Sequence, residues 1–441
     1  MTPFLDFIWY NICDPIGTIS DREVGERGGQ MVCKSERALN ALFISTFPPR
    51  KCGIATFTQH LIEALDDVDP TVHSAVLAID DQPRYAYGPQ VVSHIQQRRF
   101  PDYGAAATWI NDEPFDVVHI EHEFGIFGGD DGEYLLTLTD RLRKPYLITL
   151  HTVLRCPDAR KRRLTRALAQ GAAAVVVLAD KAVSILSDVY DIDPAKIVHI
   201  PHGAPSCGRL SRAHIRSQLG IEGRQVLCTL GLINPGKGIE NVIAALPQVA
   251  ARHPSVLYLV LGQTHPGVRA LMGESYRESL AALVQRLGVE EHVRFVDAYL
   301  SDEDLVNYLV ASDIYITPYL DAEQISSGTL AYAAGLGKAV ISTPYQYATE
   351  LLDDGRGILV PFRDPVALAQ AIDGVLSSPR RRRGMERRMA RVGNKMHWPV
   401  VARRHAQLLR TAATDAVGVR SGGEGTELVA ATKARTSAAH E

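Results

Sequence analysis

The chain has 441 residues and a mass of 48.3 kDa, a length that predicts two domains of ordinary size rather than one. A hydrophobic fraction of 46% and a charged fraction of 22% are typical of a globular protein, and a net charge of -3 gives no general attraction to nucleic acid or anionic lipid. The cysteines form no C-x-x-C pair, and no apolar run approaches the roughly 20 residues that cross a bilayer, so we expect a reduced cytoplasmic protein, at most peripheral to the inner face of a membrane.

The two ends of the chain differ from its middle. Residues 1–37 contain an apolar run, residues 4–10, that includes Asp6 and lacks the basic region and cleavage site of a signal peptide. We expect a poorly ordered N-terminal extension there. The last residues are rich in Gly, Ser, Thr and Ala and offer too little apolar surface to offset the entropy lost on ordering, so we expect residues 413–441 to form a disordered tail.

Residues 38–205 alternate between short apolar runs and longer amphipathic stretches, the pattern of a parallel sheet covered by helices on both faces. They predict one complete doubly wound domain. The predicted strands are residues 41–45, 72–79, 91–95, 117–121, 146–151, 174–178 and 197–200, and the predicted helices include residues 57–65, 134–143 and 181–189.

The alternation stops at a Pro-, Gly- and Ser-rich segment near residue 205 and then restarts, which predicts a second domain over residues 206–395. Its predicted strands are residues 226–230, 256–262, 293–295, 314–317, 339–342 and 358–361. The basic run at residues 380–395 is typical of a solvated helix face rather than a nucleic-acid site. The fold class is therefore α/β, with two Rossmann-like domains whose strand ends carry the chemistry.

The loop Gly231-Leu-Ile-Asn-Pro-Gly-Lys-Gly238 lies between a predicted strand and a predicted helix. This context suits phosphate, because exposed amides and the positive end of the helix face the ligand and Lys237 adds a full charge. The loop also matches a nucleotide-triphosphate P-loop, except that Gly238 stands where Ser or Thr would hold magnesium. We therefore expect Gly231, Gly236, Lys237 and Gly238 to bind phosphate without a metal; the alternative is a tight turn with a solvated lysine.

A second anion site is predicted where another strand is followed by a helix, in the segment Gln324-Ile-Ser-Ser-Gly-Thr-Leu-Ala-Tyr332. Ser326, Ser327, Gly328 and Thr329 supply a cap and unencumbered amides at the helix start, which suits a diphosphate. The alternative is that Ser327 only caps the helix. Two such sites in one domain favour the phosphate interpretation of both.

An ordered set of motifs resembles the family-four retaining glycosyltransferases of the GT-B superfamily, over roughly residues 40 to 410. The motifs are the Gly-rich turn at residues 47–53, His151 at a strand end, Ile200-Pro-His-Gly203, the Gly231–Gly238 loop, residues 335–342 and residues 355–361. The resemblance implies that the second domain binds a nucleotide sugar and that residues 396–412 form a helix crossing back to the first domain. We expect that helix to bury Trp398, Val401 and Leu408.

The resemblance also implies roles for individual residues. Lys237 matches the family's diphosphate-binding lysine, His151 the histidine that approaches the donor sugar, and Gly53 the turn that lets the donor come close. Four positions depart from the family pattern. Leu232 replaces an arginine, Gln324 and Tyr332 replace two glutamates that include the usual ribose ligand, and His202 stands where asparagine is common; Glu323, one residue earlier, could supply the first carboxylate after a shift in register.

The acceptor side is predicted from the loop at residues 121–131, whose acidic residues and glycines follow a strand end. We expect His122, Glu123 and Asp130 to border the acceptor together with His202; the alternative is a glycine-rich surface turn.

The predicted activity is transfer of a hexosyl group, with retention and without a metal or other cofactor, from a nucleotide sugar of the GDP-mannose or UDP- or ADP-glucose type to a carbohydrate acceptor. One alternative is a phosphorylase of the same fold that uses orthophosphate, since lost ribose contacts matter little without a nucleotide. The other is a non-catalytic subunit that binds sugar or nucleotide. The sequence carries no signal for the linkage, the acceptor or the oligomeric state.

Overall fold

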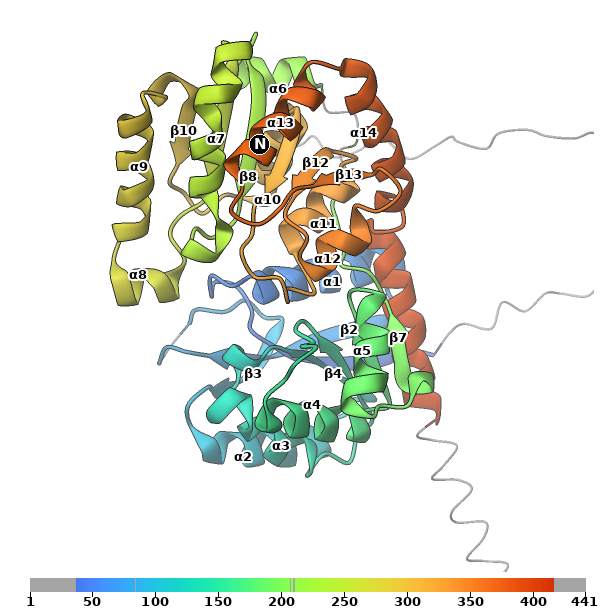
Figure 1. The fold of residues 1–441 in the computed structure, drawn as a ribbon. Coiled ribbons are helices and arrows are strands. Elements are labelled where there is room, and N and C mark those ends of the chain that lie inside the picture. The colour runs from blue at the N-terminus through green and yellow to red at the C-terminus, as the bar shows by residue number, and fades with distance from the viewer. Residues whose placement is uncertain (1–36, 84, 207, 209–210, 416–441) are drawn as a thin grey trace, which may run out of the picture. The chain divides into compact units, whose positions relative to one another are not determined.

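The computed structural model of the protein describes residues 37–83, 85–206, 208 and 211–415. The predicted N-terminal extension, except Arg37, and most of the predicted tail lie outside these residues. From Ala38 onward the described chain forms one unit, built on two all-parallel sheets that are called the first and second lobe below (Figure 1).

The first lobe contains a seven-stranded sheet in the order β3-β2-β1-β4-β5-β6-β7. Its strands are β1 (Leu39–Ser45), β2 (Val72–Asp80), β3 (Val91–Gln96), β4 (Val117–His122), β5 (Tyr146–Leu150), β6 (Ala174–Val177) and β7 (Ile197–His199). Its helices are α1 (Gly53–Val68), α2 (Phe100–Asp112), α3 (Tyr134–Thr139), α4 (Ala159–Gly171) and α5 (Lys181–Tyr190), with short 3-10 turns η1 (Phe124–Ile126), η2 (Asp130–Gly132) and η3 (Pro194–Lys196).

The second lobe contains a six-stranded sheet in the order β10-β9-β8-β11-β12-β13. Its strands are β8 (Gln225–Leu230), β9 (Val256–Leu261), β10 (Val293–Val296), β11 (Ile314–Thr317), β12 (Ala339–Ser342) and β13 (Gly357–Leu359). Its helices are α6 (Arg212–Gln218), α7 (Ile239–Arg252), α8 (Pro266–Met272), α9 (Ser275–Leu287), α10 (Asp302–Ala311), α11 (Gly328–Gly335), α12 (Gln346–Leu351), α13 (Pro365–Leu376) and α14 (Pro379–Gly393), with 3-10 turns η4 (Pro235–Lys237) and η5 (Glu290–His292).

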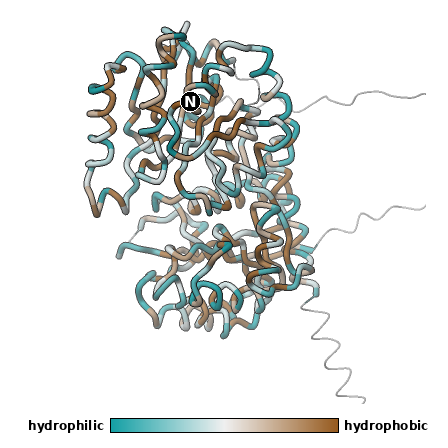
Figure 2. Tube along the Cα trace, in the orientation of Figure 1, coloured by the Kyte–Doolittle hydropathy of each residue, from teal (hydrophilic) through white to brown (hydrophobic). Residues whose placement is uncertain are grey.

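Both sheets are buried on both faces, which explains why their strands are nearly continuous apolar runs. In the first lobe, helices α2 to α5 cover one face and α1 covers the other. In Figure 2 the hydrophobic colour runs through the interior of each lobe. The predicted α/β class with two Rossmann-like sheets is confirmed. One helix is shorter than predicted: α3 ends at Thr139, whereas the sequence predicted a helix to residue 143.

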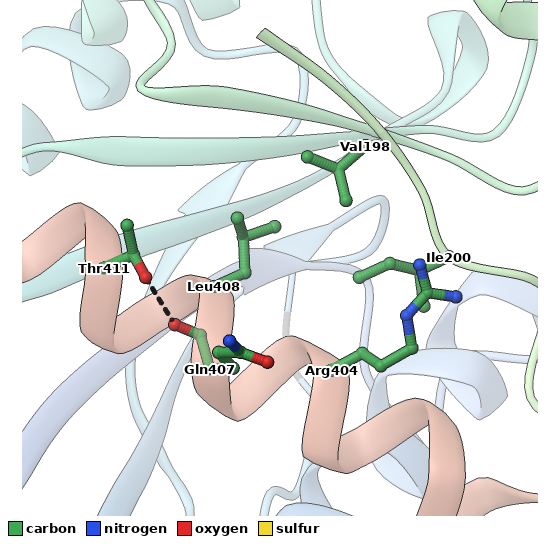
Figure 3. Close-up of a pocket in the computed structure, with 6 residues that line it drawn as sticks. All are labelled: Val198, Ile200, Arg404, Gln407, Leu408 and Thr411. Carbon is green, nitrogen blue, oxygen red and sulfur yellow. Dashed lines mark hydrogen bonds between the residues drawn. The ribbon is translucent and has the colours of Figure 1, made fainter. Parts of the chain in front are cut away.

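Residues 398–415 form a C-terminal helix that packs on the α1 side of the first sheet. Ala402, Ala406 and Leu409 are buried there against strands β1 and β2. Of the three side chains expected to be buried, Val401 is fully so, whereas Trp398 and Leu408 are half-buried. The helix also borders a groove beside β7, lined by Val198, Ile200, Arg404, Gln407, Leu408 and Thr411 (Figure 3).

The chain returns to the first lobe at a short backbone pairing. Ala204 donates its N–H to the carbonyl of Met396 at 2.8 Å and accepts from the Trp398 N–H at 3.1 Å. The two connections between the lobes therefore lie side by side. Among the described helices, none is long and apolar enough to pass through a membrane.

We expect Leu409→Ala to lower the free energy of unfolding by about 2–5 kcal/mol, because it removes a fully buried side chain and leaves a cavity under the C-terminal helix. Urea denaturation followed by fluorescence would measure the loss. Gln407→Ala, two residues earlier on the exposed face, is the control. Equal effects of the two changes would contradict the packing described here.

Candidate active site

The Gly231–Gly238 loop connects β8 to α7 and lies against the end of β11. Gly231 and Gly238 have φ of 122° and 61°, values that only glycine adopts readily. A Cβ on Gly238 would lie 2.1 Å from the carbonyl oxygen of Pro318. The carbonyl of Gly236 accepts a hydrogen bond from the Leu320 N–H at 2.9 Å. The glycines thus let the loop approach the neighbouring strand end closely and hold η4 in place.

Lys237, the last residue of η4, points along this loop rather than into solvent. Its Nζ donates to the hydroxyl of Tyr319 at 2.7 Å and lies 3.9 Å from the centre of the Tyr319 ring. That hydroxyl lies 2.8 Å from Thr329 Oγ1. Burial alone would raise the pKa of Tyr319, but the Lys237 ammonium and its hydrogen bond lower it below its usual value.

The start of α11 lies beside this lysine. A Cβ built on Gly231 would lie 3.3 Å from Thr329 Cγ2 and 3.5 Å from Lys237 Nζ, so the first loop, the lysine and the first turn of α11 converge. Ser327 caps α11 by accepting from the Leu330 N–H at 3.3 Å. The two predicted anion sites therefore form one, in which an ammonium and a helix N-terminus lie together.

His202 lies against the same helix start. Its Nδ1 is 2.7 Å from the carbonyl of Gly203, which can only accept, so Nδ1 carries the proton. Burial lowers the pKa of His202 to about 4, and the ring is neutral at pH 7. The acceptor atom Nε2 then lies 3.0 Å from the position of a Cβ on Gly328. His202 therefore presents a fixed lone pair next to the α11 N-terminus.

His151 follows β5 and joins the two lobes. Its carbonyl accepts a hydrogen bond from Ser326 Oγ at 2.8 Å, and its side chain is 8% exposed. The rings of His151 and His202 both lie edge-on to Phe57 of α1, at 5.0 and 4.9 Å between centroids. Gly53 begins α1 one turn before Phe57, and a Cβ there would meet no atom within 4 Å. These first-lobe groups thus border the start of α11.

Gln324, Glu323 and Tyr332 have other partners. The amide of Gln324 donates to the carbonyl of Ser326 at 2.9 Å, and the carboxylate of Glu323 pairs with Arg155 of the first lobe. Within the described part of the chain, neither the Gln324 amide nor the Glu323 carboxylate contacts Lys237.

Tyr332 is buried and bonds to the first lobe. Its hydroxyl lies 2.9 Å from Nδ1 of His60, whose Nε2 donates to the carboxylate of Asp302 at 2.6 Å. Because the carboxylate can only accept, Nε2 carries a proton, and the Tyr332 hydroxyl lies on the other ring nitrogen. Tyr332 is therefore occupied in a chain of hydrogen bonds between α11, α1 and α10.

The acceptor-side prediction is wrong for His122. Its ring is fully buried between Phe124 and Phe127, and neither ring nitrogen has a hydrogen-bond partner among the described residues. Burial lowers the pKa of His122 to about 3. The side chain belongs to the core because it is the inward-facing residue at the end of β4, with no face left for an acceptor.

Glu123 and Asp130, the acidic residues predicted on the acceptor side, bind other groups of the first lobe. Glu123 accepts from the Phe124 N–H at 2.9 Å and from the Thr152 hydroxyl at 2.5 Å. Asp130 pairs with Arg160 of α4. A role for either carboxylate toward an acceptor stays a prediction.

The sequence analysis did not predict a role for two residues, Tyr319 and Glu121. Tyr319 follows a predicted strand end in the sequence Thr-Pro-Tyr319, a position that could have indicated it. Glu121 was predicted as the last residue of a strand, with no role of its own, and it is the fifth residue of β4 and fully buried. The alternation His119, Glu121 on one strand face was the available signal.

Both lobes match known protein families. The family model described as Glycosyltransferase Family 4 matches residues 52–205, and the model described as Glycosyl transferases group 1 matches residues 211–392. Together they span both lobes. The chain belongs to the family-four, or group 1, glycosyltransferases.

Relatives of this glycosyltransferase include the D-inositol 3-phosphate glycosyltransferase of Kineococcus radiotolerans, 27% identical over 69% of this chain and 74% of that protein. The phosphatidyl-myo-inositol mannosyltransferase of Mycolicibacterium smegmatis is 27% identical over 68% of this chain and 72% of its own length. Among solved structures, Anabaena Alr3699/HepE in complex with UDP and glucose has a TM-score of 0.66 and 17% identity, covering 85% of this chain and 100% of its own. That likeness shows the GT-B fold.

We expect Gly238→Ala to weaken nucleoside diphosphate binding to this glycosyltransferase. The new methyl group meets the Pro318 carbonyl at 2.1 Å, so the loop that carries Lys237 must shift. Gly288→Ala is a matched control, because Gly288 adopts the same left-handed conformation, with φ of 64°, and an added Cβ would meet nothing within 4 Å, so this change bears only the strain of about 1–2 kcal/mol. Titration calorimetry with GDP and UDP would compare the two variants, and equal affinities would show that the loop does not bind the diphosphate.

Proposed function

We propose that the protein is a retaining, metal-independent hexosyltransferase that uses a nucleotide sugar of the GDP-mannose or UDP- or ADP-glucose type and a carbohydrate acceptor. The observation that carries the proposal is the convergence of Lys237, the glycine loop and the α11 N-terminus on one anion site. The relatives named as an inositol phosphate glycosyltransferase and a phosphatidyl-myo-inositol mannosyltransferase support a sugar transfer.

In the proposed reaction, the bond between the anomeric carbon and the donor phosphate breaks, and a bond to the acceptor oxygen forms on the same face of the sugar. Negative charge grows on the leaving phosphate. The Lys237 ammonium and the α11 amides near Ser327 and Gly328 stabilise that charge, which is the role that a metal ion fills in other phosphate chemistry. The phosphate oxygen then accepts the proton of the acceptor hydroxyl, so the charges balance.

The proposed place of the donor sugar is between the α11 start and the first-lobe residues His151 and His202. This follows because His151 bonds to Ser326 through its carbonyl and His202 lies beside Gly328. Gly53 leaves open space at the start of α1. The proposed acceptor approaches from the first lobe, where the relatives' names suggest that a phosphorylated inositol is the first compound to test.

A phosphorylase is the second candidate, and one observation favours it. Tyr332 stands where the family holds ribose with a carboxylate, and its hydroxyl bonds to His60 instead. An enzyme that takes orthophosphate in the same anion site needs no ribose contact. A non-catalytic binding subunit is the third candidate and would retain ligand binding without turnover.

One experiment separates these candidates. The purified protein is first screened for a rise in Tm with GDP, UDP, ADP and orthophosphate, since a ligand of the native state stabilises it by mass action. It is then incubated with the matching hexose nucleotides and with inositol phosphate or oligosaccharide acceptors, and nucleoside diphosphate release and glycoside formation are measured. Formation of sugar 1-phosphate from a glycoside and orthophosphate, without any nucleotide effect, would replace the transferase by the phosphorylase.

We expect Lys237→Ala to lower kcat by about a hundred- to a thousandfold, the scale for loss of one preorganised charge-stabilising donor. Donor affinity should fall much less, because the interaction strengthens as the phosphate leaves. The chain also lacks the family's arginine at Leu232, so no second cation shares the charge there. Steady-state kinetics alongside calorimetry of the donor would measure both quantities.

The control for this change is Lys395→Ala, which removes an exposed lysine beyond the end of α14. It should leave both kcat and affinity as in the wild type. Normal turnover of Lys237→Ala at saturating donor, with a change in KM alone, would make Lys237 a binding residue only.

A further inference from the structure

Strand β4 places a carboxylate in the interior of the first lobe. Glu121 is fully buried, on the same face of the strand as His119 and opposite to His122. A buried carboxylate is costly unless it is paired and hydrogen-bonded. Glu121 therefore needs a partner that stays in place.

That partner is His151. Its Nε2 lies 2.8 Å from Oε2 of Glu121, closer to the carboxylate than the His119 ring. The second oxygen, Oε1, lies 3.5 Å from Nε2 of His119, but that nitrogen makes its hydrogen bond to Thr149 Oγ1 at 2.8 Å. The carboxylate is thus held principally by one histidine.

The remaining titratable group that faces Glu121 comes from the C-terminal helix. His405 is fully buried and stacks on His119 at 5.3 Å between ring centroids. Burial lowers the pKa of His119 below its usual value and that of His405 to about 3. Burial alone would raise the pKa of Glu121, but the surrounding histidines and the hydrogen bond from His151 lower it below its usual value, so Glu121 is an anion at pH 7.

The hydrogen bond fixes which nitrogen of His151 carries the proton. An ionised carboxylate only accepts, so Nε2 must donate, and in the imidazole form of the ring Nδ1 is the lone-pair atom. Nδ1 has no hydrogen bond to the described residues and is left for a ligand. The ring is further held by the edge of Phe57.

We propose that Glu121 is a positioning residue, which locks His151 in the Nε2–H tautomer and so presents Nδ1 as an acceptor to a hydroxyl group of the bound sugar. The assignment of that sugar rests on the proposed function; the tautomer lock does not. Glu121 acts through His151 and touches no substrate itself. A neutral amide at this position can donate to Nε2 as well as accept from it, so Glu121→Gln releases the tautomer and lets Nδ1 become a donor.

The test compares Glu121→Gln with His122→Phe. The control alters the adjacent buried residue of the same strand, on the opposite face, where the ring already packs between two phenylalanines. Long-range proton–nitrogen NMR of histidine-labelled protein, with the His151 signals identified by their loss in His151→Asn, reports the tautomer directly. We expect Nε2–H alone for His151 in the wild type and in the control, and a mixture that includes Nδ1–H in Glu121→Gln.

Kinetics adds a second measurement. We expect kcat of Glu121→Gln to fall at least about tenfold, as when the partner that orients a functional histidine is removed, while the Kd for GDP or UDP stays unchanged because the Lys237 site is separate. Glu121→Asp, which keeps the charge, should recover part of the rate.

If Glu121→Gln does not fold, the wild-type tautomer alone decides. An Nδ1–H tautomer of His151 in the wild type would overturn the proposal, as would a Glu121→Gln variant with wild-type kcat. If the wild type has the expected tautomer but transfers no sugar to any acceptor, the proposed function fails and the positioning role stands.

Discussion

The proposed anion site depends on the hydrogen bond between the Lys237 ammonium and the Tyr319 hydroxyl. A lysine side chain has several rotatable bonds and is costly to immobilise, so a cation on a loop is rarely preorganised. Here Tyr319 is buried at the end of β11 and stacks on Tyr345 at 5.3 Å between ring centroids. The stacked rings fix the hydroxyl, and the hydroxyl fixes the ammonium. The cation is thus held in place without a ligand, which is the condition for strong electrostatic stabilisation of the phosphate proposed to bind there.

Residues of the two lobes share one site because of the direction of the strands and the contacts between the lobes. Parallel strands end at the same edge of each sheet, so the segments after β5, β8 and β11 hold the polar groups. Contacts across the lobes then align these edges. Ser326 bonds to the carbonyl of His151, and the Glu350 carboxylate of α12 accepts from the N–H groups of Asp180 and Lys181 at 2.9 and 3.0 Å. The second contact is a carboxylate at a helix N-terminus, a favourable arrangement for the helix dipole.

The sequence predicted the elements well because its information there is local. Apolar runs bounded by Gly and Pro placed the strands within a few residues, and the loop of Lys237 and the cap of Ser327 were visible because strand, loop and helix adjoin in the chain. Pairings between distant residues were not visible. Tyr332 bonds to His60, 272 positions away, and Glu121 to His151, 30 positions away on a neighbouring strand. His122 shows the same limit, since a polar residue at a strand end gives no sign of which face the core covers.

The groups around the site leave the positive charge of the half-buried Lys237 available to a ligand. The carboxylates near the lobe junction each have a partner: Glu323 has Arg155, Asp302 has His60, and Glu350 has two backbone amides. None of these three carboxylates contacts the Lys237 ammonium, whose hydrogen bond goes to Tyr319. Tyr319 is the ammonium's own partner, and it is a phenol rather than a carboxylate, so the lysine keeps its net positive charge. A carboxylate in that position would have formed an ion pair that a phosphate had to break, whereas the hydroxyl orients the cation and leaves its charge to the ligand.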